Sequence, residues 1–375
     1  MNILYLVSRL RAGGPSNQLK NIVENLDDQW DPVVLTLSPE EGATARPGFE
    51  DADIPVHSLG LSRYAGLALA PFRLRRFCWS LNPVVVHSQG VRPDLLSSLF
   101  LPERFRVATI RNYPFEDFRS KFGAVQGMLM AWLHLTVLKR VEAPVACSET
   151  VRRKMVDGHD FSPAVVQNGI DANTYVPPES AEERRARRRA LGLPSDGPIF
   201  VSVGLLIPRK DPQRVIREFH RSRAADEGVL VMLGDGPLLE ECEHEAELGA
   251  GDVRFPGFVD NVEAYLQAAN YFISASRSEG LPNTVMEALG AGVPVLLSDI
   301  PSHREILDEG AEAGRLFELG NASELAESID ELLYENESEL RIAARAVVEG
   351  HFNARRVSQE YQQIYQSAVQ HTEGQ

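Results

Sequence analysis

The sequence predicts an α/β protein of two domains, each built around a parallel β-sheet. Short runs of β-branched and other apolar residues alternate with longer amphipathic segments, as strands and helices do in a parallel sheet. The alternation stops near residue 168 and restarts at Ile199. The chain of 375 residues is also longer than one hydrophobic core usually serves, which is roughly 250 to 300 residues.

The expected strands leave room for a helix between most successive pairs. They span residues 3–7, 32–37, 84–87, 107–110 and 144–148 in the first domain, and 199–203, 229–233, 253–255, 271–274 and 294–297 in the second. The segment between the two series contains several prolines and a run of charged residues, which predicts a connection between domains. We therefore expect an N-terminal domain over residues 1–172 and a C-terminal domain over residues 173–353.

The last segment, residues 354–375, is expected to form a helix. Tyr361, Ile364, Tyr365 and Val369 recur at helical spacing and would share one side of it. In a two-domain chain such a helix can cross back to the first domain, and we expect this one to do so.

The charge is unevenly distributed along the chain. Residues 1–172 carry 19 Lys+Arg and 18 Asp+Glu, so the remaining residues carry 38 − 19 = 19 and 53 − 18 = 35, which gives +1 and −16. Nucleic-acid binding depends on basic surfaces that neutralise phosphates. An acidic chain without a broad basic stripe is therefore not expected to bind nucleic acid.

The cysteines and the N-terminus favour a cytoplasmic protein. The three cysteines, Cys78, Cys147 and Cys242, are far apart and lack the spacing of a disulfide framework or a zinc site. The N-terminal apolar run has no basic leader and no small-residue cleavage site, so it predicts a first buried strand rather than a signal peptide.

Two stretches of the first domain raise the question of membrane contact. Residues 63–79 mix apolar and basic side chains at helical spacing, which suits either an anionic bilayer surface or a docked helix with solvated arginines. Residues 122–138 are apolar and flanked by Lys121 and Lys139-Arg140, but they are marginal in length for a membrane span and contain Gln126 and His134. We expect a buried helix over residues 122–138.

The most informative segment is SASRSEGLPNTVMEALGAGVP, residues 274–294, which begins where a strand ends and continues into a helix. Ligands of open parallel sheets bind at that edge. Gly280 and Pro282 suit a tight loop, and Asn283 or Thr284 could cap the helix. The helix N-terminus would then face outward and bind a phosphate or a polar sugar group.

Two glutamates of this segment, Glu279 and Glu287, are eight positions apart and could flank one pocket. An alternative for Glu287 is a capping box with Thr284, in which its carboxylate only satisfies a backbone amide. An alternative for Glu279 is a solvated loop residue.

The segment FVSVGLLIPRKDP, residues 200–212, predicts a strand, a turn at Gly204 and a loop that bears Arg209 and Lys210. Two adjacent cations at the end of a strand could neutralise a diphosphate leaving group, which gains negative charge as its bond to the sugar breaks. The alternative is a pair of solvent-facing cations. The later segments VMLGDGP and VRFPGFV each predict a strand that leads into a glycine turn.

Together these segments resemble family 4 of the retaining glycosyltransferases, the glycogen-synthase-like group with the GT-B fold. The resemblance covers almost the whole chain, and its most specific part is the Glu-x7-Glu signature from Glu279 to Glu287. The segments VGLLIPRK, GDGP, GFV and VVQNGID are similar to other parts of the family pattern, in the correct order. Ala12-Gly13-Gly14-Pro15 is similar to its N-terminal glycine turn. The resemblance implies two facing Rossmann-like domains with a donor and acceptor cleft between them.

The resemblance also implies roles for individual residues. Lys210, with Arg209 beside it, would bind the donor diphosphate, Glu279 would contact the transferred sugar, and Glu287 would hold the ribose. The remaining donor contacts would come from Gly13, Gly14, Phe258, Val259, Gly280, Leu281, Pro282, Asn283 and Thr284. The first domain would bind the acceptor.

The chain departs from the family pattern at two positions. Leu205 stands where the family commonly has Arg, so one cation is missing, and Arg209 is the candidate replacement. Arg111 stands in the stretch where the family often has a histidine, and it cannot act as a base at neutral pH. We keep Arg111 with Glu279 and Lys210 as the candidate catalytic residues, and assign Arg111, Asn112 and His87 to the acceptor. A structural role is the alternative for His87.

The resemblance predicts a hexosyltransferase that retains anomeric configuration and uses a nucleotide-diphosphate sugar, most commonly a UDP-sugar. A glycan or lipid-linked acceptor of cell-surface polysaccharide, lipopolysaccharide or glycolipid synthesis fits the basic apolar stretches, with peripheral contact to an anionic membrane. No metal or other cofactor is expected, because Asp51-Ala52-Asp53 suits a surface turn better than a metal site. A nucleotide-sugar 2-epimerase and a non-catalytic nucleotide-sugar-binding subunit are the alternatives.

Overall fold

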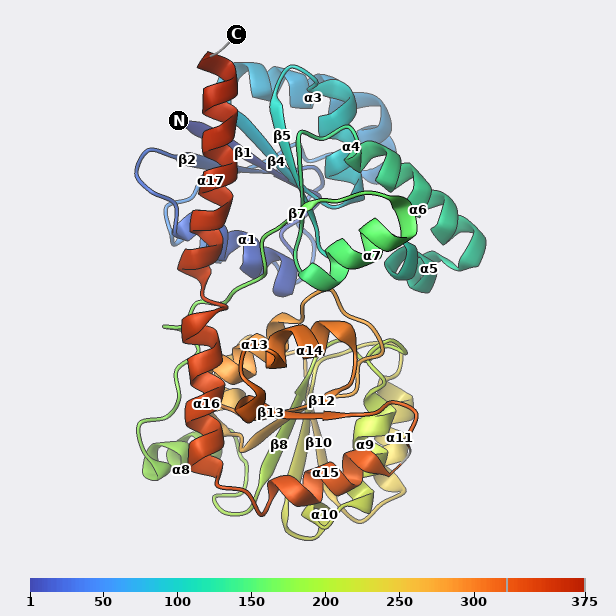
Figure 1. Cartoon of the computed structure of the whole chain (residues 1–375), viewed down its shortest axis with the longest axis vertical. Helices are drawn as coiled ribbons and strands as arrows, with labels where there is room; N and C mark the ends of the chain where they lie inside the picture. Colours follow the sequence, from blue (N-terminus) through green and yellow to red (C-terminus); the bar gives the residue numbers. More distant parts are fainter. Residues whose placement is uncertain (322, 374–375) are drawn as a thin grey trace. The chain divides into compact units, whose positions relative to one another are not determined.

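The computed structural model describes residues 1–321 and 323–373, with the side chains of residues 63–65, 67 and 371–373 left out. The chain divides into two compact units, Met1–Asn168 with Ala354–Gln375 (unit 1) and Gly169–Asn353 (unit 2) (Figure 1). The first division lies four residues before the expected boundary at residue 172. Ile170 explains this difference, because it pairs with Asn353 and its N–H donates to the carbonyl of Phe352 within unit 2.

Unit 1 is built on a seven-stranded parallel sheet in the order β3-β2-β1-β4-β5-β6-β7. The strands are β1 (Asn2–Val7), β2 (Asp31–Thr36), β3 (Val56–Ser58), β4 (Val85–Gln89), β5 (Phe105–Ile110), β6 (Ala143–Ala146) and β7 (Ala164–Val165). The strand order reverses direction between β1 and β4. The carboxyl ends of these two strands therefore flank the point where open α/β sheets bind their ligands.

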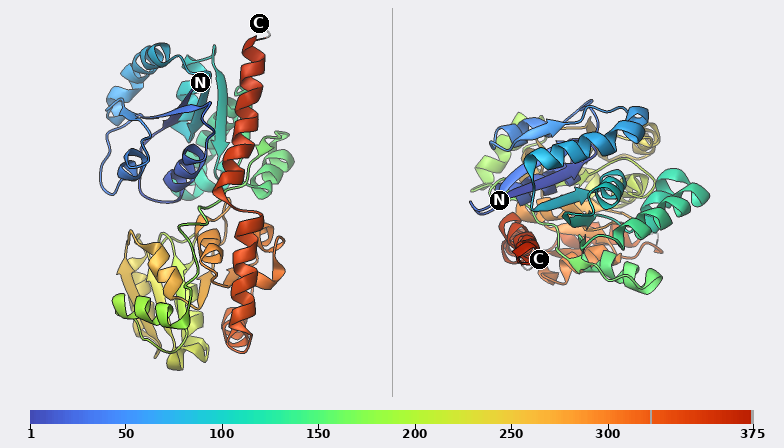
Figure 2. Two further views of the ribbon diagram at one scale, coloured as in Figure 1. Left: turned by 90° about the vertical axis from the view of Figure 1, so that its left-hand side faces the viewer. Right: turned by 90° about the horizontal axis from the view of Figure 1, so that it is seen from above.

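Helices cover both faces of this sheet (Figure 2). They are α1 (Gly14–Glu24), α2 (Arg46–Glu50), α3 (Arg63–Leu81), α4 (Val91–Phe100), α5 (Pro114–Phe122), α6 (Ala124–Leu138), α7 (Glu149–His159) and α17 (Ala354–Glu373). Because side chains alternate along a strand, Tyr5 packs with α1 and α17, whereas Leu4 and Leu6 pack with α3 and α4.

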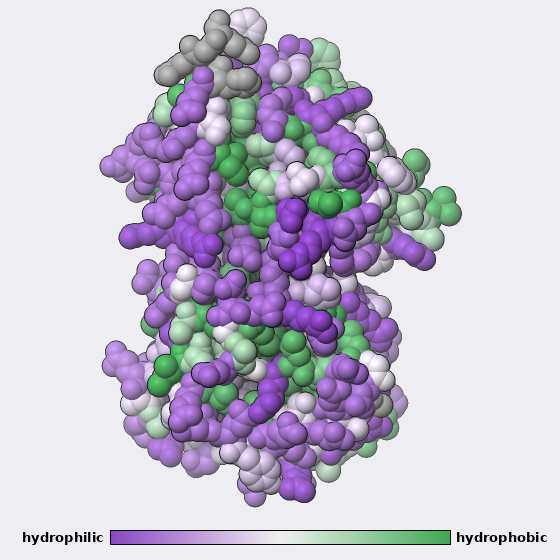
Figure 3. All heavy atoms as spheres, viewed as in Figure 1, coloured by the Kyte–Doolittle hydropathy of each residue, from purple (hydrophilic) through white to green (hydrophobic). Residues whose placement is uncertain are grey.

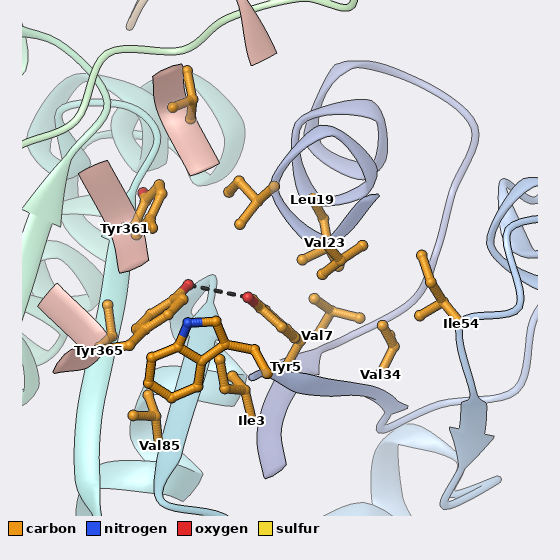
Figure 4. Close-up of a cluster of buried hydrophobic side chains, with 14 of the residues drawn as sticks. Ile3, Tyr5, Val7, Leu19, Val23, Val34, Ile54, Val85, Tyr361 and Tyr365 are labelled. Atoms are coloured by element: carbon orange, nitrogen blue, oxygen red, sulfur yellow. Dashed lines mark hydrogen bonds between the residues drawn. The ribbon is translucent and has the colours of Figure 1, made fainter. Parts of the chain in front are cut away.

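The C-terminal helix α17 belongs to unit 1, where it packs beside α1. Tyr5 and Tyr365 bring their hydroxyl groups within 3.2 Å of each other (Figure 4). The Tyr365 hydroxyl also lies 2.7 Å from Nδ1 of His87, and the Tyr361 hydroxyl lies 2.7 Å from Oγ1 of Thr109. Buried polar groups need such partners, so this network fixes α17 in one position on the sheet.

Residues 122–138 differ from the expected buried helix. Gly123 ends α5 and begins α6, and the two helices pack against each other. The inner face of α6 is buried, but its outer face is exposed, with Val125 at 86% and Leu129 at 71% exposure. The run is apolar on both faces, so its composition could not distinguish a buried helix from a half-exposed one.

Apolar side chains gather on the exposed outer face of α6 and at the end of α5 (Figure 3). Helix α3 adds the exposed Phe72 and Trp79, while the side chains of Arg63, Tyr64 and Leu67 lie outside the described residues. Within the described part of the chain, no helix is both long and apolar enough to cross a membrane.

Unit 2 is built on a six-stranded parallel sheet in the order β10-β9-β8-β11-β12-β13. The strands are β8 (Ile199–Val203), β9 (Val229–Leu233), β10 (Asp252–Gly257), β11 (Tyr271–Ser274), β12 (Val295–Ser298) and β13 (Gly314–Phe317). The order reverses between β8 and β11. Strand β13 was not expected, because it starts at Gly314, a residue that carries no β signal. The close packing of the sheet requires glycine there, since a Cβ would lie 2.1 Å from the carbonyl oxygen of Val295.

The sheet of unit 2 is surrounded by helices. They are α8 (Ala181–Ala190), α9 (Pro212–Arg221), α10 (Ala224–Glu227), α11 (Leu239–Glu247), α12 (Val262–Ala268), α13 (Asn283–Gly290), α14 (Pro301–Leu307), the 3-10 helix η1 (Ala311–Ala313), α15 (Glu324–Leu332) and α16 (Glu337–Gly350). Helix α9 follows β8 and helix α13 follows β11, so both helices begin at the carboxyl edge of the sheet.

Candidate functional site

A buried cluster of charges lies at the carboxyl edge of the unit 2 sheet. The carboxylate of Glu279, in the loop after β11, lies 2.7 Å from Nη1 of Arg209 and 2.5 Å from Nζ of Lys210, both in the loop after β8. The Glu279 side chain is only 7% exposed, and Ser276 donates to it at 2.7 Å. Burial alone would raise the pKa of Glu279, but Lys210 and Arg209 outweigh it and lower the pKa to about 2.

The two loops are held together by backbone contacts and by glycine. The N–H of Arg277 donates to the carbonyl of Arg209 at 2.8 Å. Gly204 turns the chain after β8 with a φ of 153°, and its Cα faces the Lys210 side chain, since a Cβ there would lie 3.4 Å from Cε of Lys210. Gly234 is packed still more tightly, because a Cβ there would lie 1.9 Å from the Gly204 oxygen. The close approach of the two loops therefore excludes any residue larger than glycine at position 234.

Glu287 lies on α13 and is 6% exposed. Its carboxylate is hydrogen bonded to the hydroxyl of Tyr175. Burial and the nearby Glu263 raise the pKa of Glu287 to about 7, although Tyr175 and Lys210 lower it. The capping-box alternative is wrong, because the carboxylate is hydrogen bonded to a distant tyrosine. The expectation that Asn283 or Thr284 caps the helix is also wrong, since α13 begins at Asn283 with Pro282 as its N-cap.

The other residues expected at the donor site occupy the same edge of the sheet. Gly280, Leu281 and Pro282 are buried in the loop between Glu279 and α13. Phe258 and Val259 directly follow β10, and Phe258 is 54% exposed. The side chain of Leu205, which stands where the family commonly has Arg, is 61% exposed. The loop after β8 therefore presents an apolar side chain where the family commonly has a cation.

Sequence reasoning missed Tyr175 and Ser276, which hydrogen bond the two glutamates. Ser276 lies three residues before Glu279, and its position in the loop could have indicated the contact. Tyr175 lies in the connection between the two strand series, more than a hundred residues before Glu287, so no local pattern identified it.

Unit 1 has a pocket of about 340 Å³ at the carboxyl ends of β1, β4 and β5. Helices α1, α4 and α5 all begin beside it. Its polar and charged lining residues are Ser8, Arg9, Ser16, Gln89, Thr109, Arg111, Asn112, Asp117, Lys121 and His134. Arg111 and Asn112 thus lie together as expected, whereas Gln89, Lys121 and His134 were not assigned to a binding site from the sequence. Gly13, the N-cap of α1, has a φ of 136° and open space beside its Cα.

The structure corrects the expectation for His87. This side chain is fully buried, and its Nδ1 and Nε2 lie 2.7 Å from the hydroxyl groups of Tyr365 and Thr109. Burial and then the charge of Arg111 lower the pKa of His87 to about 3, so the ring is neutral. His87 therefore holds α17 on the sheet and has no surface left for an acceptor.

Two parallel α/β sheets, each with charged loops at its carboxyl edge, match the two domains of solved GT-B glycosyltransferases, so the chain has the GT-B fold. The family model described as "Glycosyl transferase 4-like domain" matches residues 13–169, and that described as "Glycosyl transferases group 1" matches residues 183–347. The chain belongs to family 4 of the glycosyltransferases.

Individual relatives agree with this assignment. The O-antigen biosynthesis glycosyltransferase WclY of Escherichia coli is 25% identical over 373 residues, 97% of this chain and 98% of WclY. A second E. coli relative, UDP-Gal:alpha-D-GlcNAc-diphosphoundecaprenol alpha-1,3-galactosyltransferase, is 23% identical over 205 residues, 52% of this chain and 51% of that protein. The crystal structure of HepE from Anabaena in complex with UDP-glucose has a TM-score of 0.84 at 18% identity, covering 98% of this chain and 100% of HepE.

Proposed function

We propose that this protein is a retaining, metal-independent hexosyltransferase that uses a UDP-sugar and a glycan or lipid-linked acceptor. The observation that carries the proposal is the buried cluster of Glu279, Arg209 and Lys210 at the carboxyl edge of the unit 2 sheet. Cations held at a strand end suit a diphosphate, and a buried carboxylate suits sugar hydroxyl groups. The family to which the chain belongs gives the reaction class.

Each residue of the cluster has a proposed role. Lys210 binds the donor diphosphate with help from Arg209, Glu279 accepts hydrogen bonds from the transferred sugar, and Glu287 binds the ribose. Phe258 is exposed at the same edge and would stack on the base. The loop from Gly280 to Thr284 would add contacts from the N-terminus of α13 to the phosphate and sugar.

The proposed chemistry needs no protein nucleophile. The acceptor hydroxyl attacks the anomeric carbon on the face from which the diphosphate departs, so one carbon–oxygen bond forms while another breaks. The departing phosphate oxygen takes the hydroxyl proton. Lys210 stabilises the charge that develops on the diphosphate, and this is the step at which preorganised cations contribute most to the rate.

The relatives support the donor and the type of acceptor. WclY is named for O-antigen biosynthesis, HepE was solved with UDP-glucose, and the second E. coli relative is named for a galactosyl transfer from UDP-Gal to a diphosphoundecaprenol-linked sugar. We infer a role in lipopolysaccharide or a related cell-surface polysaccharide, on the cytoplasmic side of the membrane.

The exposed apolar face of α6 supports peripheral membrane binding by unit 1. Residues 122–138 contain no charged side chain, and the exposed Lys121, Lys139 and Arg140 flank them. Apolar side chains inserted at the interface, with basic residues near anionic headgroups, are typical of proteins that lie on a membrane.

The first experiment measures binding of UDP, GDP, ADP and their common sugar conjugates by calorimetry, with and without EDTA. We expect a uridine nucleotide to bind, EDTA to have no effect, and Lys210→Ala to weaken binding. Arg223→Ala is the matched control, since Arg223 is an exposed cation of unit 2 that contacts Tyr334.

Three results would contradict the proposal. Nucleotide-sugar binding without transfer to any acceptor would favour the non-catalytic alternative. Conversion of the sugar nucleotide without an acceptor would favour the 2-epimerase. Loss of binding in EDTA would exclude a metal-independent donor site.

A further inference from the structure

Residues at the N-termini of three helices line the pocket of unit 1. Pro15 and Ser16 from the first turn of α1, Gly90 and Val91 at the start of α4, and Pro114 at the start of α5 all line it. Pro15 and Pro114 have no N–H, and the N–H of Ser16 donates to the carbonyl of Gly13. These helices therefore contribute mainly the positive end of their dipoles, which favours negative charge. Three helix N-termini thus converge on one pocket.

Arg111 adds a positive charge that no carboxylate of the described residues neutralises. Its guanidinium donates to the carbonyl of Pro15 at 3.0 Å and to Oε1 of Gln89. Nε of Arg111 and Nε2 of Gln89 are buried without a hydrogen-bond partner among the described residues. A buried donor without a partner is unfavourable, so a ligand that supplies acceptor oxygens would be stabilised here.

The other two cations of the pocket already have partners. Nζ of Lys121 lies 2.7 Å from the carboxylate of Asp117, and Nη1 of Arg9 lies 3.0 Å from that of Glu41. Arg111 is therefore the cation of this lining that has only neutral partners in the described structure.

His134 reaches the same pocket from the inner face of α6. Its Nε2 lies 2.8 Å from Oδ2 of Asp94, a fully buried residue of α4. Its Nδ1 is buried without a partner among the described residues, and the whole side chain is only 5% exposed. A carboxylate that accepts from one ring nitrogen fixes the orientation of the imidazole. The other nitrogen, Nδ1, then donates to a phosphate oxygen in the imidazolium form of the ring.

We propose that this pocket binds a phosphate or diphosphate group of the acceptor, with Arg111, Gln89 and Asp94-oriented His134 as its ligands. The inference rests on the proposed function and names the chemistry of its acceptor. Phosphate oxygens accept hydrogen bonds, and they match the donors of the Arg111 guanidinium, the Gln89 amide and the protonated His134 ring. A neutral sugar would need acceptors for its own hydroxyl groups, and the carboxylate of Asp117 is engaged by Lys121.

The pocket and the exposed apolar surface share α6. His134 lies on the inner face of this helix, and Leu129 and Trp132 lie on its outer face. One helix would therefore contact both the charged group of the acceptor and the membrane from which a lipid-linked acceptor comes.

The test uses inorganic pyrophosphate as the probe in calorimetry with the full-length protein saturated with UDP. We expect pyrophosphate still to bind, and Arg111→Gln to weaken it by about tenfold or more, as for a lost charge-assisted hydrogen bond. Arg111→Lys, which keeps the charge, should lose less. His134→Gln should weaken binding by roughly fivefold. UDP affinity should stay unchanged in all three variants.

Two outcomes would overturn the inference. If saturation with UDP abolishes pyrophosphate binding, the anion of this site is the donor diphosphate. If Arg111→Gln and Gln89→Leu, shown to be folded by circular dichroism, bind pyrophosphate as the wild type does, the pocket is not an anion site. Failure of UDP itself to bind would instead contradict the proposed function.

Two further measurements refine the assignment. Nitrogen NMR of the His134 ring should show a change at Nδ1 when pyrophosphate is added, and no change would remove His134 from the ligand set. Geranyl diphosphate should bind more tightly than pyrophosphate if the acceptor is lipid-linked. Equal affinities would assign the pocket to an acceptor whose phosphate carries no lipid.

Discussion

Both units have cations in the loops at the carboxyl edge of their sheet, but the positive charge of these cations is balanced differently in the two units. At the carboxyl edge of unit 2, Arg209 and Lys210 share the buried carboxylate of Glu279. At the carboxyl edge of unit 1, Arg111 contacts only neutral oxygens. A ligand of unit 2 must compete with an internal carboxylate, whereas a ligand of unit 1 would supply the missing negative charge. The same sheet edge can therefore be prepared for a ligand in two different ways.

The largest expected effect comes from Lys210→Ala, which leaves Arg209 as the one cation paired with Glu279 among the described residues. Transfer from the nucleotide sugar should fall about 100- to 1000-fold, because a preorganised group that stabilises the departing diphosphate is lost. Initial rates with the best donor, together with thermal unfolding of the variant, check this prediction. Arg223→Ala should keep normal rates. If Lys210→Ala lowers the amount of folded protein as strongly as it lowers the transfer rate, the cation is needed for structure.

The second effect concerns the pH dependence of stability. The pKa of Glu287 is raised from 4.5 to about 7, so the folded protein keeps a proton that the unfolded chain loses. Stability from this group is fully present below pH 4.5 and is lost as the pH rises to 7, by about 3 kcal/mol. Urea unfolding at pH 5 and pH 8 should show this loss in the wild type and a much smaller one in Glu287→Gln. Glu240→Gln, an exposed glutamate of the same unit, should behave as the wild type.

A smaller effect is expected from Tyr175→Phe, which removes the hydroxyl that binds Glu287. At pH 8, where Glu287 is charged, the free energy of unfolding should fall by about 1.5 to 3 kcal/mol. At pH 5, where the carboxyl group is protonated, the fall should be nearer 1 kcal/mol. Unfolding curves at both pH values measure the difference. An equal loss at both pH values would show that the contribution of the Tyr175 hydroxyl does not depend on the charge of Glu287.

The smallest effect extends the comparison to the surfaces of the two units. Of the 17 large apolar residues that are exposed in the described structure, 10 lie between residues 69 and 133 of unit 1. Leu129→Ser with Val125→Ser should reduce binding to anionic vesicles by roughly tenfold, with little change in thermal stability, because both side chains are largely exposed. Ile342→Ser, at an exposed apolar residue of unit 2, should leave vesicle binding unchanged. If the wild type, the double variant of α6 and Ile342→Ser all bind anionic vesicles equally, α6 is not the membrane contact.

The sequence by itself determined most of the sheets and the position of the charged cluster. Apolar runs located most of the strands of the described structure, including β8 and β11. Once both strands belong to one parallel sheet, the loops that follow them must lie at the same edge. The proximity of Lys210 and Glu279 could therefore be predicted, because each residue follows one of these two strands, although nearly seventy residues separate them.

Tertiary structure alone decided which polar and apolar side chains are covered. His87 follows the pattern of a site residue at a strand end, but Tyr365, 278 positions later, covers it. Helix α6 is apolar on both faces, and only its packing on α4 and α5 determines which face stays exposed. Contacts of Tyr175 with Glu287 and of His134 with Asp94 likewise join separate elements. The local sequence pattern shows which residues are polar and which are apolar. Whether a side chain is buried depends on the helices and strands that pack against it, and these can be distant in the sequence.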